Sequence, residues 1–201
     1  MTRILLINIG RKKMSNRIKA LREGTGLSET QISSLLNISS YKYKRVENGS
    51  LNLTVDVLVL LSIMYGVPMS FLTFDRYETD DISLNKFIEK YKNLSENDVI
   101  SILKFRICQY CTFECSSVNY RVTKNILSRT IKSFSENLYN LRRKESLELS
   151  DICSKLQIDI KHYRTLEEGK MWPTLYELEN LALIYSKPID EILTVKKCSE
   201  K

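Results

Sequence analysis

The sequence predicts an all-α protein, and three observations support this prediction. Apolar residues recur at steps of three and four over most of the chain, which is the period of an amphipathic helix. The interval between Pro68 and Gly169 contains no glycine and no proline, the residues that most often end a helix. A helical pattern of 57 residues also occurs twice. The repetition indicates two small helical domains.

The composition is that of an ordinary globular protein. The chain has 201 residues, of which 43% are hydrophobic and 27% are charged. Its longest apolar run, residues 57–61, is far shorter than the roughly 20 residues of a membrane span. A basic cluster follows the short apolar patch near the N-terminus, whereas in a secretory signal it precedes the patch. We therefore expect a cytoplasmic protein with no membrane partner.

The repeat defines the domain organisation. Residues 17–73 align with residues 137–193 without a gap, and 15 of the 57 positions are identical. The stretches "YKRVENG" and "YRTLEEG" fall at corresponding positions. The predicted organisation is a basic arm over residues 1–13, a first domain over 14–74, a helical linker over 75–133 and a second domain over 134–201. Residues 1–13 are either this arm or a segment ahead of a true start at Met14.

Copy one reads as five short helices in order. The first ends at "GTG", because glycine adopts the positive φ that lets the chain leave a helix. The second begins after Ser28, which caps it while Gln31 reaches back in a capping box. Ser39 opens the third, which ends before "NGS", and Thr54 opens the fourth. Pro68 begins the fifth.

Copy two repeats this order, and the linker before it is also predicted to be helical. Its corresponding caps are Asp159 and Thr174, the latter with Glu177 as the partner in a capping box. A run of apolar residues at alternating steps of four and three leads into its first helix; these residues are Leu127, Ile131, Phe134, Leu138 and Leu141. They form either an intramolecular core or the seam of a dimer.

Both copies resemble the lambda-repressor and Cro-like helix-turn-helix domain. The motif is an arginine late in the first helix, a leucine that opens the second, and Glu-x-Gly after the recognition helix. The matching residues are Arg22, Leu27, Ile32, Ile38, Glu47 and Gly49 in copy one, and Arg142, Leu147, Ile152, Ile158, Glu167 and Gly169 in copy two. The resemblance covers 114 of the 201 residues. It implies two five-helix DNA-binding domains joined by a helical spacer.

The resemblance also implies roles for individual residues. In the family, the glutamate pairs with the arginine of the first helix, which predicts structural ion pairs Arg22–Glu47 and Arg142–Glu167. In copy one the residues expected at the DNA are Ser39, Ser40, Tyr41, Lys42, Lys44 and Arg45 in the major groove, with Ser28, Glu29 and Thr30 at a phosphate. Glu29 stands where the family commonly has glutamine, which weakens the phosphate contact. Copy two offers Lys161 and Arg164, beside Asp159.

The charge distribution separates the two copies. The net charge is +7 overall, +6 over residues 1–74 and −1 over residues 134–201. A basic first third is typical of a surface that meets a polyanion. We therefore expect a sequence-specific transcriptional regulator of double-stranded DNA, by family frequency a repressor, that acts as a homodimer or as an intramolecular pseudo-dimer. The alternative is a regulatory module in which domain 2 and the linker bind a protein or peptide partner.

Five cysteines in a chain without a secretory signal argue for reduced thiols. Cys108, Cys111 and Cys115 have a spacing that suits a metal or an iron–sulfur cluster if Cys153, Cys198 or His162, the only histidine, supplies a fourth ligand. The alternative, which we favour, is that the three thiols pack on one face of a helix. No cofactor is expected. No catalytic motif occurs in the sequence, so it does not indicate an enzyme.

Overall fold

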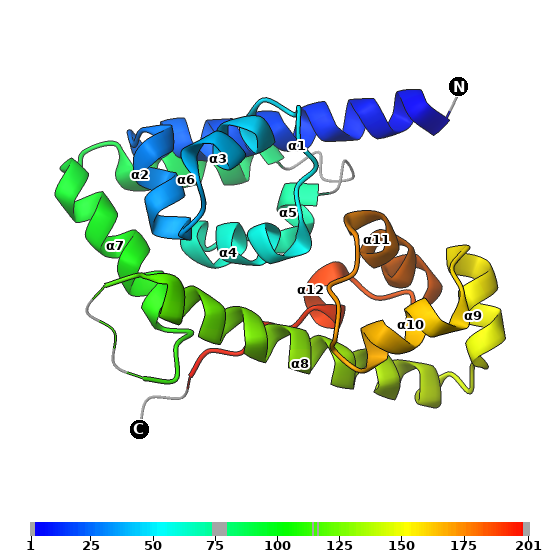
Figure 1. Ribbon diagram of the computed structural model, residues 1–201. Coiled ribbons are helices and arrows are strands. Elements are labelled where there is room, and N and C mark those ends of the chain that lie inside the picture. The colour runs from blue at the N-terminus through cyan, green and yellow to red at the C-terminus, as the bar shows by residue number, and fades with distance from the viewer. Residues whose placement is uncertain (1–2, 74–79, 114, 116, 199–201) are drawn as a thin grey trace.

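The computed structural model describes residues 3–73, 80–113, 115 and 117–198, and this part of the chain contains helices and no strand (Figure 1). The all-α prediction is confirmed. In chain order the helices are α1 (Arg3–Thr25), α2 (Glu29–Leu36), α3 (Ser40–Glu47), α4 (Val55–Tyr65), α5 (Met69–Thr73), α6 (Asp80–Tyr91), α7 (Glu96–Cys108), α8 (Tyr120–Lys144), α9 (Leu149–Leu156), α10 (Ile160–Glu167), α11 (Leu175–Ile184) and α12 (Ile189–Ile192). Among the described residues, no helix has the length and apolar character that crossing a bilayer requires.

The internal repeat of the sequence is also a repeat of helices. Helices α2 and α3 have the same lengths as α9 and α10, and their bounds differ by 120 positions. Helices α4 and α5 likewise begin 120 positions before α11 and α12. Each copy therefore contains the five helices that its sequence predicts, with α1 and α8 as the first helix of each set.

The predicted helix caps are present and explain where the short helices begin. The hydroxyl of Ser28 accepts a hydrogen bond from the backbone of Gln31, and the Gln31 side chain accepts one from the Ser28 backbone in return. Thr174 and Glu177 form the same capping box at α11. Asn37 ends α2 with a φ of 55°, a left-handed conformation that asparagine tolerates better than most residues.

Helix α1 is longer than the sequence predicted. It begins at Arg3, so that residues 3–13, predicted as an arm, belong to the same continuous helix as Ile18 and Leu21. This segment contains no proline, and its one glycine, Gly10, costs a helix only about 1 kcal/mol relative to alanine. That cost is too small to separate residues 3–13 from the helix that follows them.

The linker is helical as predicted, but it packs against copy one and does not stand apart from it. Helix α6 contacts α1, and α7 contacts α4. The ring of Phe87 in α6 lies 5.7 Å from the ring of Tyr65 in α4. The guanidinium of Arg106 in α7 donates to the backbone carbonyls of Met64 and Tyr65 at the C-terminal end of α4. These contacts fix α6 and α7 to the first set of helices.

Helix α8 joins the linker to copy two without a break. Phe134 and Leu138, which belong to the apolar seam seen in the sequence, are fully buried within the single chain. Leu127 and Leu141 pack against the same core. The structure therefore uses these residues as intramolecular core, which is one of the two alternatives that the sequence left open.

A buried tyrosine pair recurs in the core of each copy. The hydroxyls of Tyr163 and Tyr185 lie 3.1 Å apart in copy two. The corresponding residues of copy one, Tyr43 and Tyr65, are also buried. Burial raises the pKa of Tyr43 and Tyr163 far above the ordinary value. The tyrosine that the two repeated motifs share is thus a core residue and is not available to a ligand.

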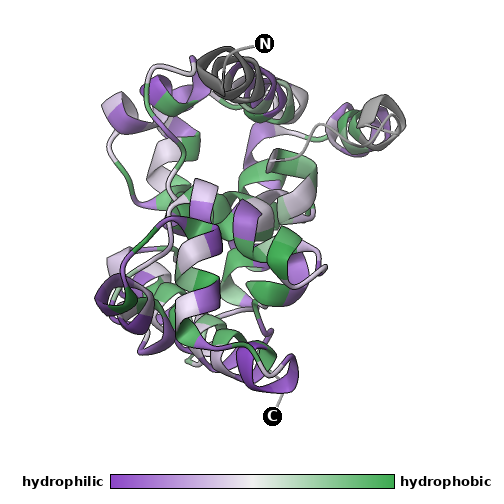
Figure 2. Cartoon of the chain, turned by 90° about the vertical axis from the view of Figure 1, so that its right-hand side faces the viewer, coloured by the Kyte–Doolittle hydropathy of each residue, from purple (hydrophilic) through white to green (hydrophobic). Residues whose placement is uncertain are grey.

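The two sets of helices meet through corresponding elements. Helix α5 of copy one contacts α12 of copy two, and α4 contacts α8. In Figure 1, α5 and α12 lie at the centre, with α2 and α3 toward one end of the molecule and α9 and α10 toward the other. Figure 2 shows hydrophobic residues concentrated in the middle and hydrophilic residues over the outer helices.

Candidate nucleic-acid interface

Helices α2 and α3 cross at a tight turn that the sequence fixes on both sides. Ser39 caps α3 by accepting a hydrogen bond from the backbone of Lys42 at 3.1 Å. The hydroxyls of Ser33 in α2 and Ser40 in α3 lie 2.9 Å apart. Ile32 and Val46 are buried beneath the two helices. The start of α3 is therefore held by its own cap and by a direct bond to α2.

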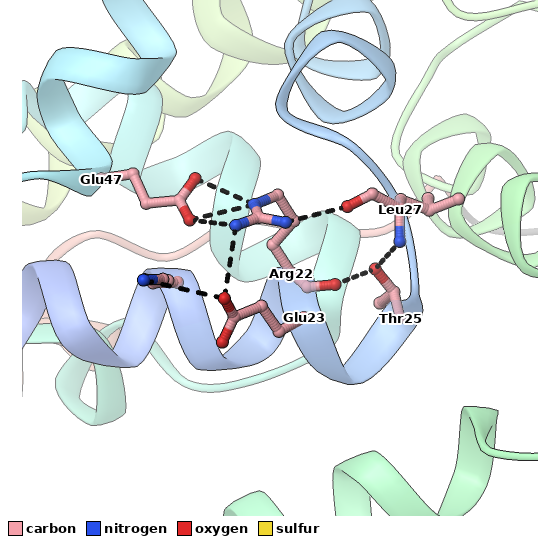
Figure 3. Close-up of polar contacts among 6 residues, drawn as sticks. Arg22, Glu23, Thr25, Leu27 and Glu47 are labelled. Carbon is pink, nitrogen blue, oxygen red and sulfur yellow. Dashed lines mark hydrogen bonds and ion pairs between the residues drawn. The ribbon is translucent and has the colours of Figure 1, made fainter.

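The end of α3 is fixed to α1 by the ion pair that the sequence predicted (Figure 3). The carboxylate of Glu47 accepts hydrogen bonds from Nε and Nη2 of Arg22 at distances of 2.7 to 3.0 Å. Nη1 of Arg22 donates to the carbonyl of Leu27, the residue that follows the turn out of α1. The hydrogen bond to Glu47 raises the pKa of Arg22. One guanidinium thus holds α1, the turn and α3 together.

Copy two contains the same pair. Nε of Arg142 donates to Oε1 of Glu167 at 2.6 Å, and Nη2 donates to Oε2 at 3.1 Å. The hydrogen bond to Glu167 again raises the pKa of the arginine. Both predicted pairs are present, and in both the glutamate is turned to the interior. Each glutamate therefore holds the third helix of its copy against the first helix.

The outer face of α3 carries the side chains that the sequence singled out. Tyr41 is 72% exposed, and the guanidinium of Arg45 lies 5.5 Å from the centre of its ring. Arg45 also donates to the carbonyl of Ser50 in the turn after α3. Lys44 is exposed one residue before Arg45, whereas Lys42 is half-buried. The structure therefore gathers Tyr41, Lys44 and Arg45 on one side of a short, firmly positioned helix.

Three of the predicted serines also make hydrogen bonds that hold the fold together. Ser39 and Ser40 are exposed at the start of α3, but their hydroxyls already cap the helix and bond to Ser33. At the start of α2, Ser28 is engaged in its capping box. Thr30 is exposed and Glu29 is half-buried. Of the residues predicted at the phosphate, Thr30 therefore has the most accessible hydroxyl.

A basic groove runs along α1 beside α3, and the α1 residues that line it were not among the site residues that the sequence predicted. The groove has a volume of about 450 Å³ and is lined by Lys12, Ser15, Asn16, Lys19, Glu29, Lys44, Glu47, Asn48 and Gly49. Three of these residues, Lys12, Asn16 and Lys19, follow one face of α1 at helical spacing. The signal was visible in the sequence, but it appears only if residues before Met14 are taken as helical.

Copy two presents a different surface at the same place. Lys161 and Arg164 are exposed on α10, in agreement with their predicted position. Ile160, at the position that Ser40 occupies in copy one, is 44% exposed. Asp159 accepts a hydrogen bond from the backbone of His162 as the helix cap. His162 itself bonds to Glu177 at 2.8 Å, so that the single histidine holds α10 to α11.

The prediction for the cysteines was wrong in its geometry. Helix α7 ends at Cys108, and the three residues do not share a helical face. Cys108 and Cys115 form a disulfide across the loop that follows, which also contradicts the expectation of reduced thiols. Cys111, which lies within this loop, is a free and buried thiol. The described residues contain no group of three or more metal-ligating side chains.

The cysteines do not share a helix because α7 ends at Cys108, although the segment that follows contains no glycine or proline. A second helix, α8, begins soon afterwards at its own cap. Asn119 caps α8 by accepting a hydrogen bond from the backbone of Val122, and the chain reverses before this cap. The C-terminal segment closes over the same loop, because the backbone of Cys198 donates to the carbonyl of Gln109. Nη1 of Arg129 in α8 lies 2.9 Å from Sγ of Cys198.

No family model matches the chain, no curated protein matches it, and no solved structure matches its fold.

Proposed function

We propose that the chain is a sequence-specific DNA-binding transcriptional regulator that inserts α3 into the major groove. The observation that carries the proposal is the construction of α3. Its inner face is fixed by the Arg22–Glu47 pair and by the Ser33–Ser40 bond. Its outer face presents Tyr41 and two cations. An α-helix of this kind fits the major groove of B-DNA, which is about 12 Å wide.

The chemistry of the outer face suits base recognition. The guanidinium of Arg45 can donate two parallel hydrogen bonds to a guanine, and Lys44 can reach a base edge or a phosphate. The ring of Tyr41 offers an apolar surface for a thymine methyl group. Because Arg45 is oriented by Tyr41 and Ser50, little conformational freedom remains to be lost on binding.

The surface beside α3 suits the phosphate backbone. Lys12, Lys19 and Lys44 line the basic groove along α1, and lysines bind phosphates as point charges. The backbone N–H groups at the start of α2 add a second site for a phosphate, next to the exposed Thr30. Glu29 opposes this second contact. We assign the groove to DNA positioning and α3 to sequence recognition.

The resemblance to lambda-repressor and Cro-like domains supports repression as the mode of action. A protein that occupies the major groove near a promoter excludes polymerase from that site. This sign of regulation rests on the family resemblance and not on the geometry of α3.

The test is a selection of binding sites from a random duplex library with the full chain, followed by titration of the best site at several salt concentrations. We expect log K to fall with log[salt] at a slope of about −0.9 for each phosphate contacted. The variant Lys44→Ala/Arg45→Ala should lose roughly 10- to 100-fold in affinity for that site, because the forked contact of Arg45 to a base disappears. The matched control is Lys86→Ala/Lys92→Ala, which removes two exposed lysines on and after α6.

A loss of affinity in the control equal to that in the α3 variant would show that only net charge matters. Failure of the full chain to select any sequence would refute the proposed function itself.

A further inference from the structure

The contact between α5 and α12 joins the two copies through corresponding helices. Met69 and Leu72 of α5 are buried, and so are Ile189 and Ile192 of α12, which lie exactly 120 positions further along the chain. The two short helices contact each other. When the same element of two like units forms both sides of an interface, the interface is isologous, and the units are related by a two-fold axis.

Asp190 fixes this contact. Its carboxylate accepts hydrogen bonds from the backbone N–H groups of Met69, at 2.6 Å, and of Ser70, at 3.1 Å. These are the first two residues of α5, whose N–H groups have no partner within the helix. A carboxylate at a helix N-terminus is also favoured by the helix dipole. Residue 190 corresponds to Ser70 in copy one, so the hydrogen bonds run in one direction only and distinguish the two copies.

Further contacts restrict rotation about the α5–α12 interface. Helix α8, the first helix of copy two, contacts α4 of copy one. Asn137 of α8 donates to the carbonyl of Ile192, which ties the end of α12 to α8. Arg106 ties the preceding helix α7 to the end of α4. The α4–α8 contact therefore adds to the α5–α12 contact between the copies, and α3 and α10 have a defined relative position.

Figure 1 shows the result of this arrangement. Helices α2 and α3 lie toward one end of the molecule, and α9 and α10 lie toward the other, with α5 and α12 between them. Helix α1 runs along one edge and α8 along the opposite edge. Each element of copy one thus has its counterpart across the centre, as a two-fold axis through the α5–α12 contact requires.

We propose that a single chain binds one DNA duplex as an intramolecular pseudo-dimer, with α3 in one half-site and α10 in the next. The proposal rests on the proposed function of α3. A two-fold axis places the half-sites in inverted orientation, and entry into successive major grooves on one side of the duplex places them about one helical turn, or 34 Å, apart. The complex contains one chain for each site.

The two half-sites differ in sequence, because the two helices carry different side chains. Copy one presents Tyr41, Lys44 and Arg45, whereas copy two presents Lys161 and Arg164 at the positions of Tyr41 and Lys44. The cations of α10 allow a forked contact to guanine in its own half-site. The operator is therefore an imperfect inverted repeat that has one orientation relative to the chain.

The experiment measures stoichiometry and half-site dependence with the full chain and the selected duplex. Sedimentation velocity should give one chain per duplex at saturating protein. Scrambling either half-site should reduce the affinity of the unmodified chain by roughly 10- to 100-fold, as expected for the loss of one or two base contacts. Lys161→Ala/Arg164→Ala should become insensitive to scrambling of the second half-site while it still distinguishes the first. Lys44→Ala/Arg45→Ala should show the reverse.

The variant Asp190→Ala tests the fixed spacing. Loss of the two hydrogen bonds to α5 should reduce the preference for half-sites one turn apart, so that duplexes with a lengthened centre lose less affinity than they do with the unmodified chain. Asp190→Asn, which keeps one carbonyl acceptor, should be intermediate. Unchanged spacing preference in both variants, when both fold, would overturn the role assigned to Asp190.

The outcomes separate this inference from the proposed function. Specific binding with two chains per duplex, or with a single half-site that Lys161→Ala/Arg164→Ala does not affect, would overturn the pseudo-dimer and leave α3 as the reader. In that case copy two, which exposes Ile160 on α10, is assigned to a protein partner. Absence of any specific site would overturn both.

Discussion

Replacing Glu47 by glutamine tests the structural role of the ion pair in copy one. The substitution keeps the shape of the side chain and one carbonyl acceptor but removes the negative charge. In the folded protein the side chains of Arg22 and Glu47 are only 14% and 4% exposed. The guanidinium therefore loses its counter-ion at a site where water replaces little of the lost interaction.

The structure sets the size of the effect. Two nitrogens of Arg22 contact the carboxylate in three close N···O approaches, and a hydrogen bond to a charged group contributes about 1.5 to 3 kcal/mol. Nη1 keeps its bond to Leu27 in the variant, and Glu23 remains 3.7 Å from Nη2. We therefore expect Glu47→Gln to lower the free energy of unfolding by about 2 to 3 kcal/mol, below the 3 to 5 kcal/mol of a fully buried broken pair.

Urea unfolding of the full chain, followed by circular dichroism at 222 nm, measures this change. Glu23→Gln is the matched control, because Glu23 lies beside the same guanidinium but is 56% exposed; it should cost less than about 0.5 kcal/mol. Glu167→Gln should cost somewhat less than Glu47→Gln, because Glu167 makes fewer contacts with its arginine. A change below 0.5 kcal/mol for Glu47→Gln, on the scale of an exposed pair, would refute the scaffold role of the glutamate.

Three further predictions concern the core, the loop and the turns. Because burial raises the pKa of Tyr43, its hydroxyl stays protonated above pH 10 in the folded state but loses its proton in the unfolded state. The free energy of unfolding should therefore fall by about 1.4 kcal/mol per pH unit above pH 10 because of this residue. Urea titrations of Tyr43→Phe should show a shallower fall. Reduction of the disulfide, or Cys108→Ser, should lower the free energy of unfolding by at most about 2.5 kcal/mol, which is the loop entropy of a closed segment of this length. As a control, the reductant should not change the Tm of Cys108→Ser. Gly66→Ala should lower the Tm more than Gly26→Ala in a thermal melt. Both glycines have a positive φ, which costs alanine about 1 to 2 kcal/mol, but only at Gly66 does the added Cβ lie within 3 Å of Arg106.

The caps were predictable because they depend on residues at fixed spacing in the sequence, and the ion pairs were predictable because the family resemblance implied them. A capping box needs only Ser28 and Gln31 three positions apart, and both lie in the segment that folds locally. The spacing of 25 residues between arginine and glutamate occurs in both copies. A second copy of the same spacing served as an internal check that a single occurrence does not offer.

The groove along α1 and the disulfide were not predictable by the same reasoning. Treating residues 1–13 as an arm removed the helical phase that brings Lys12, Asn16 and Lys19 to one face. For the cysteines, the absence of glycine and proline suggested one continuous helix, whereas the position of Cys115 depends on how α8 turns back against α7. Such reversals are set by packing between elements and leave only a weak signal, here the cap residue Asn119.

The role of Asp190 shows a limit of reading two copies by their similarities. The residue aligns with Ser70 and belongs to a short helix, α12, in which no position is identical to its counterpart in copy one. Its role depends on a difference between the copies, since a carboxylate in copy two accepts hydrogen bonds from backbone N–H groups that have no partner within α5 of copy one. In a pair of identical domains a bond of this kind occurs twice, once on each side of the axis. Here it occurs once.

In the DNA complex that we propose, the two copies contribute unequally to binding. Copy one has a basic surface, in which the lysines of α1 adjoin the cations of α3, and contacts to phosphates supply much of the affinity of DNA-binding proteins. Copy two is close to neutral, and the cations of its α10 are Lys161 and Arg164. In the proposed complex, the α5–α12 contact already positions α10, so that copy two needs little affinity of its own: the first copy brings it to the duplex at a high effective concentration. A weak but specific second reader is therefore sufficient to select an inverted repeat over an isolated half-site.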